Sequence, residues 1–244
     1  MIVLLVIVGL ILTMAISYCV LMSPYSQFFG NFPYKLDTHE KIIALTFDDG
    51  PNEPYTSQIA DYLTLKKIRA TFFQVGKCVE RFPETTRKIA ADGHIIGNHT
   101  LSHEFHKYFF HSGFDSEIQL TQTILRRQLN KTPLLFRPPW LWRTPMIMRT
   151  IRKYSLRPIS GRFCYIFEIF QPDCSQIAKR AIAKARPGAI IIFHDGFDSR
   201  GGNRHETVKA VKITVETLLK QGYKFVTVDE LFGVKPYYLL NQPT

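Results

Sequence analysis

Two hydrophobic patterns alternate along most of this chain. Short apolar runs that end in polar or turn-forming residues predict buried strands. We predict strands over residues 42–47, 70–76, 94–98, 134–136, 157–160, 189–193 and 224–228. Between these runs, apolar residues recur at a helical period, which predicts helices over residues 56–67, 83–92, 115–129, 145–154, 175–185 and 206–221.

Strands that alternate with helices at this spacing are typical of right-handed βαβ units, whose strands form a parallel sheet. Polar residues cluster directly after several of the strands. The pattern therefore predicts an α/β fold, a (β/α) barrel whose site lies at the carboxyl ends of the strands. Because we find no internal repeat, we expect one domain over residues 41–232 and a C-terminal tail over 233–244.

The N-terminal residues 1–22 carry no charged side chain and are mostly Ile, Leu, Val and Met. At about 1.5 Å of rise per residue, a helix of this length spans the hydrocarbon core of a bilayer. The basic start and the small-residue cleavage site of a signal peptide are missing. This favours an uncleaved transmembrane anchor, with a cleaved signal peptide as the alternative.

Residues 23–40 are predicted to form a linker, and its aromatic part over 24–34 suits a membrane interface. Lys35 and Lys41 follow the apolar span and no basic residue precedes it. The positive-inside rule alone would place the domain in the cytoplasm, but long domains cross the membrane largely regardless of charge. Orientation therefore depends on function.

Composition and charge narrow the class of protein. The chain has 244 residues, 45% hydrophobic and 21% charged, which is typical of a globular protein. The net charge of +11 suits an anionic polymer or membrane surface, but the basic residues are scattered and no nucleic-acid-binding motif is present. We therefore predict no nucleic acid partner.

Four cysteines, with no C-x-x-C pair, argue against a structural zinc site. Cys19 lies in the apolar leader, and Cys78 lies in the predicted domain. Cys164 and Cys174 could form a disulfide in an oxidising compartment, and buried free thiols are the preferred alternative.

Asp48 and Asp49 end the first predicted strand, just before the turn formed by Gly50 and Pro51. Neighbouring side chains on a strand point to opposite faces, so the two carboxylates cannot do the same work. One can bind a cation while the other faces a substrate. A solvated acidic turn is the alternative, and partners elsewhere in the chain decide between them.

His99 and His103 are candidate metal ligands. In a helical turn, their spacing of four residues would put both imidazoles on one face. Together with Asp49 they would leave open positions for water and substrate, as in a catalytic metal site. Zinc is the first choice for these donors, with iron, cobalt or nickel as alternatives.

Arg137 and His194 each follow a predicted strand directly. Pro138 and Pro139 fix the backbone after Arg137, so its guanidinium could orient a carboxylate, although a structural ion pair is the alternative. His194 leaves the most apolar strand and is well placed to act as a general acid. A purely structural histidine is the alternative there.

Taken together, these motifs resemble the polysaccharide deacetylase family, the NodB-homology domains of the family 4 carbohydrate esterases. The resemblance covers roughly residues 41–232. Its motifs occur in order as Thr46-Phe47-Asp48-Asp49-Gly50-Pro51, His99-x-x-x-His103, Arg137-Pro138-Pro139-Trp140 and His194-Asp195. Shorter matches lie between them, at residues 70–73, 93–99 and 222–227.

The resemblance implies a distorted (β/α) barrel in which Asp49, His99 and His103 hold one divalent transition metal. It implies that Asp48 is the general base, oriented by Arg137, and that His194 protonates the departing sugar amine. The metal and the Trp140 backbone N–H would stabilise the oxyanion, with Pro139 beside it on the substrate side.

Two positions depart from the family pattern. Leu141 stands where the family commonly has a glycine after the aromatic residue. The Asp-Trp pair that tunes the acid histidine is also missing, and Glu168 is the best match to its acid. We therefore expect Glu168 to hold His194 and the substrate groove to differ.

The leading hypothesis is a membrane-anchored, metal-dependent hydrolase that removes N-acetyl groups from an N-acetylglucosamine-containing glycan, outside the cytoplasm. Peptidoglycan or a surface glucosamine polymer comes first, then chitin oligomers. The alternatives are an O-acetyl esterase on xylan, a catalytically silent glycan-binding protein and a basic membrane-surface protein. A silent protein is expected to lose part of the catalytic set, and here every member is present.

Overall fold

The structure is a computed structural model that describes residues 1–109 and 111–239. Its main sheet has eight parallel strands, in the order β6-β5-β3-β2-β1-β8-β7, with β9 paired to the first half of β1. The strands are β1 (Ile42–Asp48), β2 (Thr71–Gln74), β3 (Ile95–Asn98), β5 (Leu135–Phe136), β6 (Arg157–Pro158), β7 (Arg162–Phe163), β8 (Ala189–His194) and β9 (Lys224–Val226). This curled sheet confirms the predicted parallel, distorted barrel.

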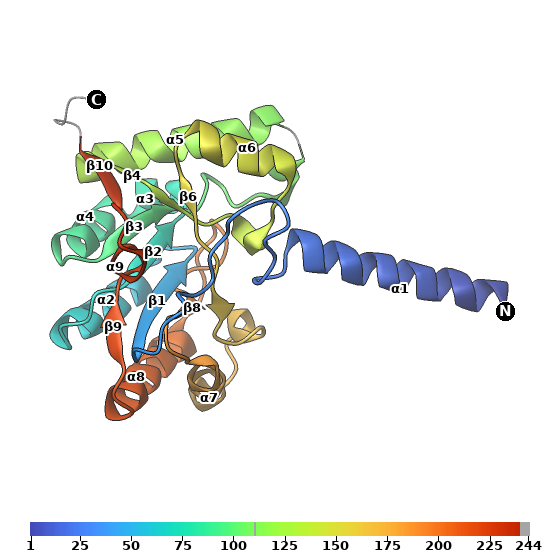
Figure 1. Ribbon diagram of the computed structural model, residues 1–244. Helices are drawn as coiled ribbons and strands as arrows, with labels where there is room; N and C mark the ends of the chain where they lie inside the picture. The colour runs from blue at the N-terminus through green and yellow to red at the C-terminus, as the bar shows by residue number, and fades with distance from the viewer. Residues whose placement is uncertain (110, 240–244) are drawn as a thin grey trace.

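Helices surround the sheet, with α5 and α6 together on one side and α7 and α8 together on the opposite side (Figure 1). They are α2 (Tyr55–Leu65), α3 (Gly76–Arg81), α4 (Pro83–Ala91), α5 (His111–Leu129), α6 (Pro145–Lys153), α7 (Cys174–Lys184), α8 (His205–Lys220) and α9 (Val228–Phe232). The six predicted helices are confirmed, and α5 begins four residues before the predicted start. The short helices α3 and α9 were not predicted.

Strand β1 has two buried faces with different neighbours. Ile43, Leu45 and Phe47 belong to the large cluster between the sheet and its helices. The alternate residue Ala44 packs inside the barrel with β2, β5 and β8. Because side chains alternate along a strand, Asp48 shares the inner face with Ala44. The alternation thus delivers Asp48 into the barrel mouth.

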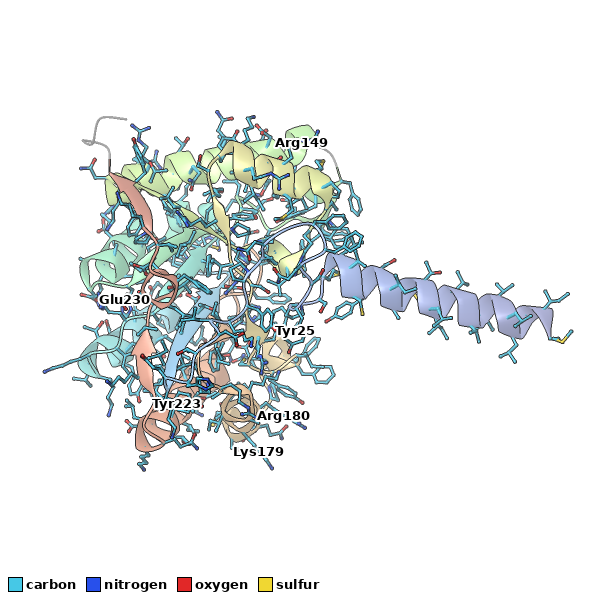
Figure 2. The ribbon with its side chains drawn as sticks, viewed as in Figure 1. Tyr25, Arg149, Lys179, Arg180, Tyr223 and Glu230 are labelled. Atoms are coloured by element: carbon cyan, nitrogen blue, oxygen red, sulfur yellow. The ribbon has the colours of Figure 1, made fainter. Side chains whose placement is uncertain are left out.

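Helix α1 (Ile2–Leu21) projects from the domain (Figure 1), and its side chains point outward on all sides (Figure 2). Its length and composition are sufficient to cross a membrane, and none of its hydrophobic window is buried. The segment after it packs on the barrel: Phe32 is buried, and Ser160 donates hydrogen bonds to the carbonyls of Pro24 (2.8 Å) and Pro33 (2.8 Å).

The C-terminal segment 233–244, expected as a tail, contains strand β10 (Tyr237–Leu239). This strand pairs antiparallel with β4 (Lys131–Pro133) in a separate two-stranded sheet. The four cysteines are free thiols, so Cys164 and Cys174 do not pair. Cys78 and Cys164 are buried, as the preferred alternative expected.

Candidate active site

The two aspartates at the end of β1 point in different directions. Asp48 accepts a hydrogen bond from Arg137 Nη1 at 2.7 Å. Asp49 has left the strand with a φ of +76°, and its carboxylate turns toward His99 and His103. The predicted divergence of the two carboxylates is therefore observed, and it is produced by both strand alternation and the left-handed backbone at Asp49.

Arg137 is fully buried, and each arm of its guanidinium has a partner. Besides Asp48, Nη1 donates to Thr46 Oγ1 at 2.7 Å, while Nε and Nη2 donate to the carbonyls of Ile159 (3.1 Å) and Ser160 (3.0 Å). These contacts fix the guanidinium on three sides. Arg137 therefore positions Asp48 and does not itself line the cleft.

Asp49, His99 and His103 converge as a buried group of three metal-ligating side chains. Asp49 Oδ1 lies 3.2 Å from His99 Nε2 and 3.3 Å from His103 Nε2, and it has no hydrogen-bond partner among the described residues. His99 Nδ1 lies 2.6 Å from the Arg137 carbonyl and must donate its proton there, which leaves Nε2 of neutral His99 as an acceptor. Acceptors facing one another in a buried site fit a cation between them.

His103 has a carboxylate partner at its other ring nitrogen, since its Nδ1 lies 2.9 Å from Asp198 Oδ1. Such outer partners fix the tautomer and direct Nε2 at the ligand position. Burial acts to raise the pKa of Asp49, but the His103 and His99 imidazoles lower it well below its usual range. The Asp49 carboxylate is therefore ionised, as a metal ligand requires.

The segment from His99 to His103 is not the helical turn that the sequence predicted. Thr100 and His103 have φ values of +70° and +56°, which no right-handed helix contains. The Glu117 carboxylate accepts the backbone N–H groups of Leu101 (2.9 Å) and Ser102 (2.7 Å). The Glu117 carboxylate therefore accepts hydrogen bonds from N–H groups that would otherwise be available to a helix. An irregular loop, and not a helical turn, brings the two imidazoles together.

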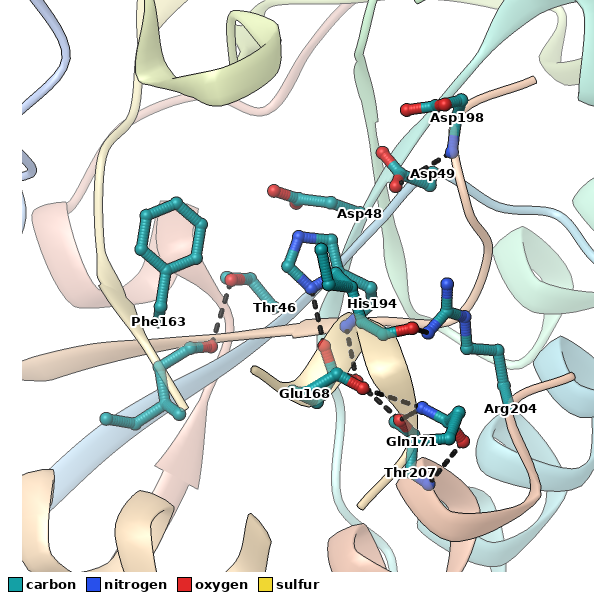
Figure 3. A network of polar contacts seen from close by, with 12 residues as sticks. Thr46, Asp48, Asp49, Phe163, Glu168, Gln171, His194, Asp198, Arg204 and Thr207 are labelled. Atoms are coloured by element: carbon teal, nitrogen blue, oxygen red, sulfur yellow. Dashed lines mark hydrogen bonds and ion pairs between the residues drawn. The ribbon is translucent and has the colours of Figure 1, made fainter. Parts of the chain in front are cut away.

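His194 ends β8 and lies between Asp48 and Glu168 (Figure 3). Its Nδ1 lies 2.7 Å from Glu168 Oε2, and Glu168 is fully buried. Burial acts to lower the pKa of His194, but the Glu168 carboxylate more than offsets it and the pKa rises to about 9. The imidazole is therefore protonated at neutral pH, with Nε2 left for the cleft.

Glu168 is itself fixed by neighbours from α8 and the loop before α7 (Figure 3). Thr207 donates a hydrogen bond to Glu168 Oε1, and Gln171 Nε2 donates to Thr207 Oγ1 at 2.8 Å. The Phe163 ring stacks on the His194 ring at a centroid distance of 6.0 Å and an interplanar angle of 8°. An aromatic ring from β7 thus packs against the histidine, although the family's tryptophan is absent.

The loops after β1 and β8 interlock through two glycines. A Cβ atom on Gly50 would lie 2.0 Å from Asp195 Oδ2, and one on Gly196 would lie 2.3 Å from the Asp49 carbonyl oxygen. Burial and the nearby Asp49 carboxylate raise the pKa of Asp195 to about 7. Asp198 N–H donates to Asp49 Oδ2 at 3.1 Å and ties the β8 loop to the metal group.

A cleft of about 240 Å³ opens above these groups. Its walls are mostly apolar or aromatic, and its polar floor consists of the site residues already described. Trp140 and Pro138 lie in the wall, whereas Pro139 is buried and does not line the cleft. Trp140 packs its ring against His103 at a centroid distance of 4.4 Å. Pro138, and not the predicted Pro139, therefore lies on the substrate side of the site.

All the other predicted site residues meet at this end of the barrel. Glu168 and Arg137 lie behind the residues that they hold. Sequence reasoning missed Asp198, Phe163 and Tyr18, the last of which reaches the cleft from α1. Asp198 could have been flagged because it follows His194 in the same loop, whereas Tyr18 sits in an apolar span with no local signal.

Comparisons with known proteins agree with this geometry. A peptidoglycan-N-acetylglucosamine deacetylase of Bacillus cereus is 33% identical over 207 residues, which cover 84% of this chain and 95% of the relative. A chitooligosaccharide deacetylase of Azorhizobium caulinodans is 30% identical over 199 residues, covering 78% and 93%. The crystal structure of the Bc1960 peptidoglycan N-acetylglucosamine deacetylase superposes with a TM-score of 0.76 at 27% identity, covering 85% and 93%.

The family model for polysaccharide deacetylase matches residues 35–159, which include Asp48, Asp49, His99, His103 and Arg137. This span and the sequence identity to the deacetylases confirm the resemblance drawn from the motifs. The chain belongs to the polysaccharide deacetylase family.

Proposed function

We propose that this chain is a metal-dependent hydrolase that removes N-acetyl groups from an N-acetylglucosamine-containing glycan. One observation carries the proposal: a base candidate, an acid candidate and a buried metal-ligand group line one cleft. The base candidate is Asp48 and the acid candidate is His194. The two deacetylase relatives align with this chain over more than nine-tenths of their own length.

Asp48 is the proposed general base. Arg137 holds Asp48 Oδ1, and Asp48 lines the cleft, where its carboxylate can take the proton of an attacking water. His194 is the proposed general acid, because Glu168 keeps its imidazole charged and oriented. It would pass the Nε2 proton to the sugar amine as the amide bond breaks. Trp140 forms the wall beside the reacting carbonyl.

Asp49, His99 and His103 are the proposed metal ligands, and two imidazoles with one carboxylate are the donors of many catalytic zinc sites. When bound, the cation would polarise the carbonyl and lower the pKa of a water. Zinc is our first choice, with cobalt, nickel and iron as alternatives that metal analysis separates.

We also propose that α1 stays attached as a membrane anchor, with the domain over residues 41–232 outside the cytoplasm. Two observations support this placement. The relatives named for peptidoglycan act on a polymer of the cell wall, and α1 is long and apolar enough to span a bilayer. A retained helix also contributes Tyr18 to the cleft.

The test is acetate release from a panel of acetylated substrates, with and without chelator. The panel contains peptidoglycan, chitin oligomers and acetylated xylan. We expect chelator-sensitive release from the N-acetylated glycans. Release from xylan alone would assign the esterase alternative, and no release from any substrate by metal-loaded protein would overturn the proposal.

A further inference from the structure

The end of α1 is held against the catalytic domain by hydrogen bonds. The backbone N–H of Arg143 donates to the Leu21 carbonyl at 2.9 Å, across the junction. The buried Arg143 guanidinium then donates to the carbonyls of Ser23 (2.8 Å) and Ser26 in the segment that follows. Trp142 lines a groove against α1, beside Ser17.

This attachment sets the depth of the cleft relative to a bilayer. With 20 residues, α1 is about 30 Å long, the thickness of the hydrocarbon core. Tyr18 lies three residues before the end of α1, which is about 4.5 Å along the axis. Tyrosines near the end of a membrane span are enriched at the interface between hydrocarbon and headgroups. Because Tyr18 lines the catalytic cleft, the cleft opens at the level of the lipid headgroups.

Several large apolar side chains near the cleft are exposed on the surface of the domain. We define the apolar rim as six residues that are between 41% and 74% exposed: Phe28, Phe105, Phe109, Ile166, Phe167 and Phe170. Phe105 packs against the rings of Trp140 and Trp142 at centroid distances of 5.1 and 5.3 Å. Ile166 lines the cleft together with Tyr18. The rim therefore lies next to the cleft, with Phe105 against Trp140 and Phe167 against Tyr165, and the cleft is shared with Tyr18 of α1.

We propose that the apolar rim rests in the headgroup layer of the membrane that α1 crosses, with the catalytic cleft facing that membrane. Exposed apolar patches of this kind mark interaction surfaces, and continuity with α1 selects the bilayer as the occupant. The proposal rests on the proposed anchor and deacetylase function and deepens it. The substrate is an acetylated amino sugar held at the membrane surface.

Fluorescence quenching tests the orientation without any assay of activity. Full-length protein in phosphatidylcholine and phosphatidylglycerol vesicles would carry Trp140→Phe and Trp142→Phe, which remove the two native tryptophans. A single tryptophan is then introduced by Phe170→Trp, or by Leu65→Trp on α2 as an equally exposed control. We expect brominated acyl chains to quench the first and not the second. Equal quenching of both, or of neither, would overturn the proposal.

Activity in the same vesicles tests the substrate. Phe109, Phe167 and Phe170 line no part of the cleft, so their combined replacement by serine should spare the chemistry. We expect turnover of a vesicle-embedded N-acetylglucosaminyl glycolipid to fall about tenfold, because the rim loses its apolar contact. Turnover of a soluble chitin oligomer should stay within about twofold, and Leu65→Ser should change neither.

The outcomes separate this proposal from the proposed function. Equal losses on glycolipid and soluble oligomer would overturn the membrane-facing rim, as would cross-linking of the rim to a second copy. No acetate from either substrate would overturn the proposed function, while quenching would still report how the domain lies on the membrane.

Discussion

Two carboxylate–histidine pairs in this site have similar separations and different proposed roles. Asp198 lies 2.9 Å from Nδ1 of His103, and Glu168 lies 2.7 Å from Nδ1 of His194. The difference lies at the other ring nitrogen. Nε2 of His103 faces the Asp49 carboxylate at 3.3 Å, whereas the His194 ring lies by Asp48 at the cleft. What faces Nε2 is the basis on which we propose His103 as a metal ligand and His194 as a proton donor.

The comparison also shows how the two carboxylates differ. Glu168 is fully buried and held by Thr207, whereas Asp198 is partly exposed and pairs with Arg200 as well. A buried partner acts on the imidazole with little solvent screening, which suits a strongly raised pKa. A partly exposed partner such as Asp198 is sufficient to orient an imidazole.

The largest effect is expected from Asp48→Asn, which leaves both pairs in place. Deacetylation should fall by about 10³-fold, because the base is lost while Arg137 and the metal ligands remain. Acetate release and metal content, measured on one preparation, check this. His99→Ala should lose both quantities, and near-normal turnover by Asp48→Asn would remove Asp48 from the role of base.

Glu168→Gln should change proton transfer and leave the metal in place. Without the Glu168 charge, burial dominates and the pKa of His194 falls from about 9. We expect turnover to fall about 100-fold and the alkaline limb of the pH–rate profile to move to lower pH. An unchanged profile would show that Glu168 does not tune the acid.

Asp198→Asn is the matched change in the other pair. Loss of an outer partner of a ligand typically weakens metal binding by about 10- to 100-fold. We expect weaker affinity, turnover restored by excess metal, and an alkaline limb that stays where it was. A limb that moves as far as in Glu168→Gln would show that the two pairs are not separate in function.

The smallest effect is expected in stability against pH, measured by urea unfolding of metal-free protein. The folded pKa of His194 is raised from 6.5 to about 9, so its pairing with Glu168 contributes fully below pH 6.5. That contribution is lost as the pH rises from 6.5 through about 9. The wild type should lose stability over this window, and Glu168→Gln should lose less. Parallel curves would contradict the raised pKa.

Much of this fold was predictable because its determinants are local. The apolar run of β1, followed by two aspartates, predicts a buried strand with candidate site residues at its end. The apolar run of β8, followed by His194, predicts the same arrangement. The loop from His99 to His103 was not predictable. Its path depends on Glu117, fifteen or more residues away, whose carboxylate binds the loop backbone.

The site shows the same division. Strand ends brought Asp48, Asp49 and His194 together, as the parallel sheet requires. The approach of Glu168 to His194 depends on the fold of the stretch before α7, where spacing alone gives no direction. Tyr18 lines the cleft because a hydrogen bond from Arg143 fixes the end of α1 to the domain. The hydrophobic pattern of α1 does not predict this contact.

The interlocked glycines have a consequence for anyone who would redesign this enzyme. Gly50 lies against the loop after β8 and Gly196 lies against the loop after β1, and neither position has space for a side chain. The two loops therefore depend on each other's backbone path. A loop borrowed from another deacetylase at either position would displace its partner, and with it both Asp49 and His194. Grafting new specificity onto this scaffold therefore means exchanging both connections at once, as one cassette.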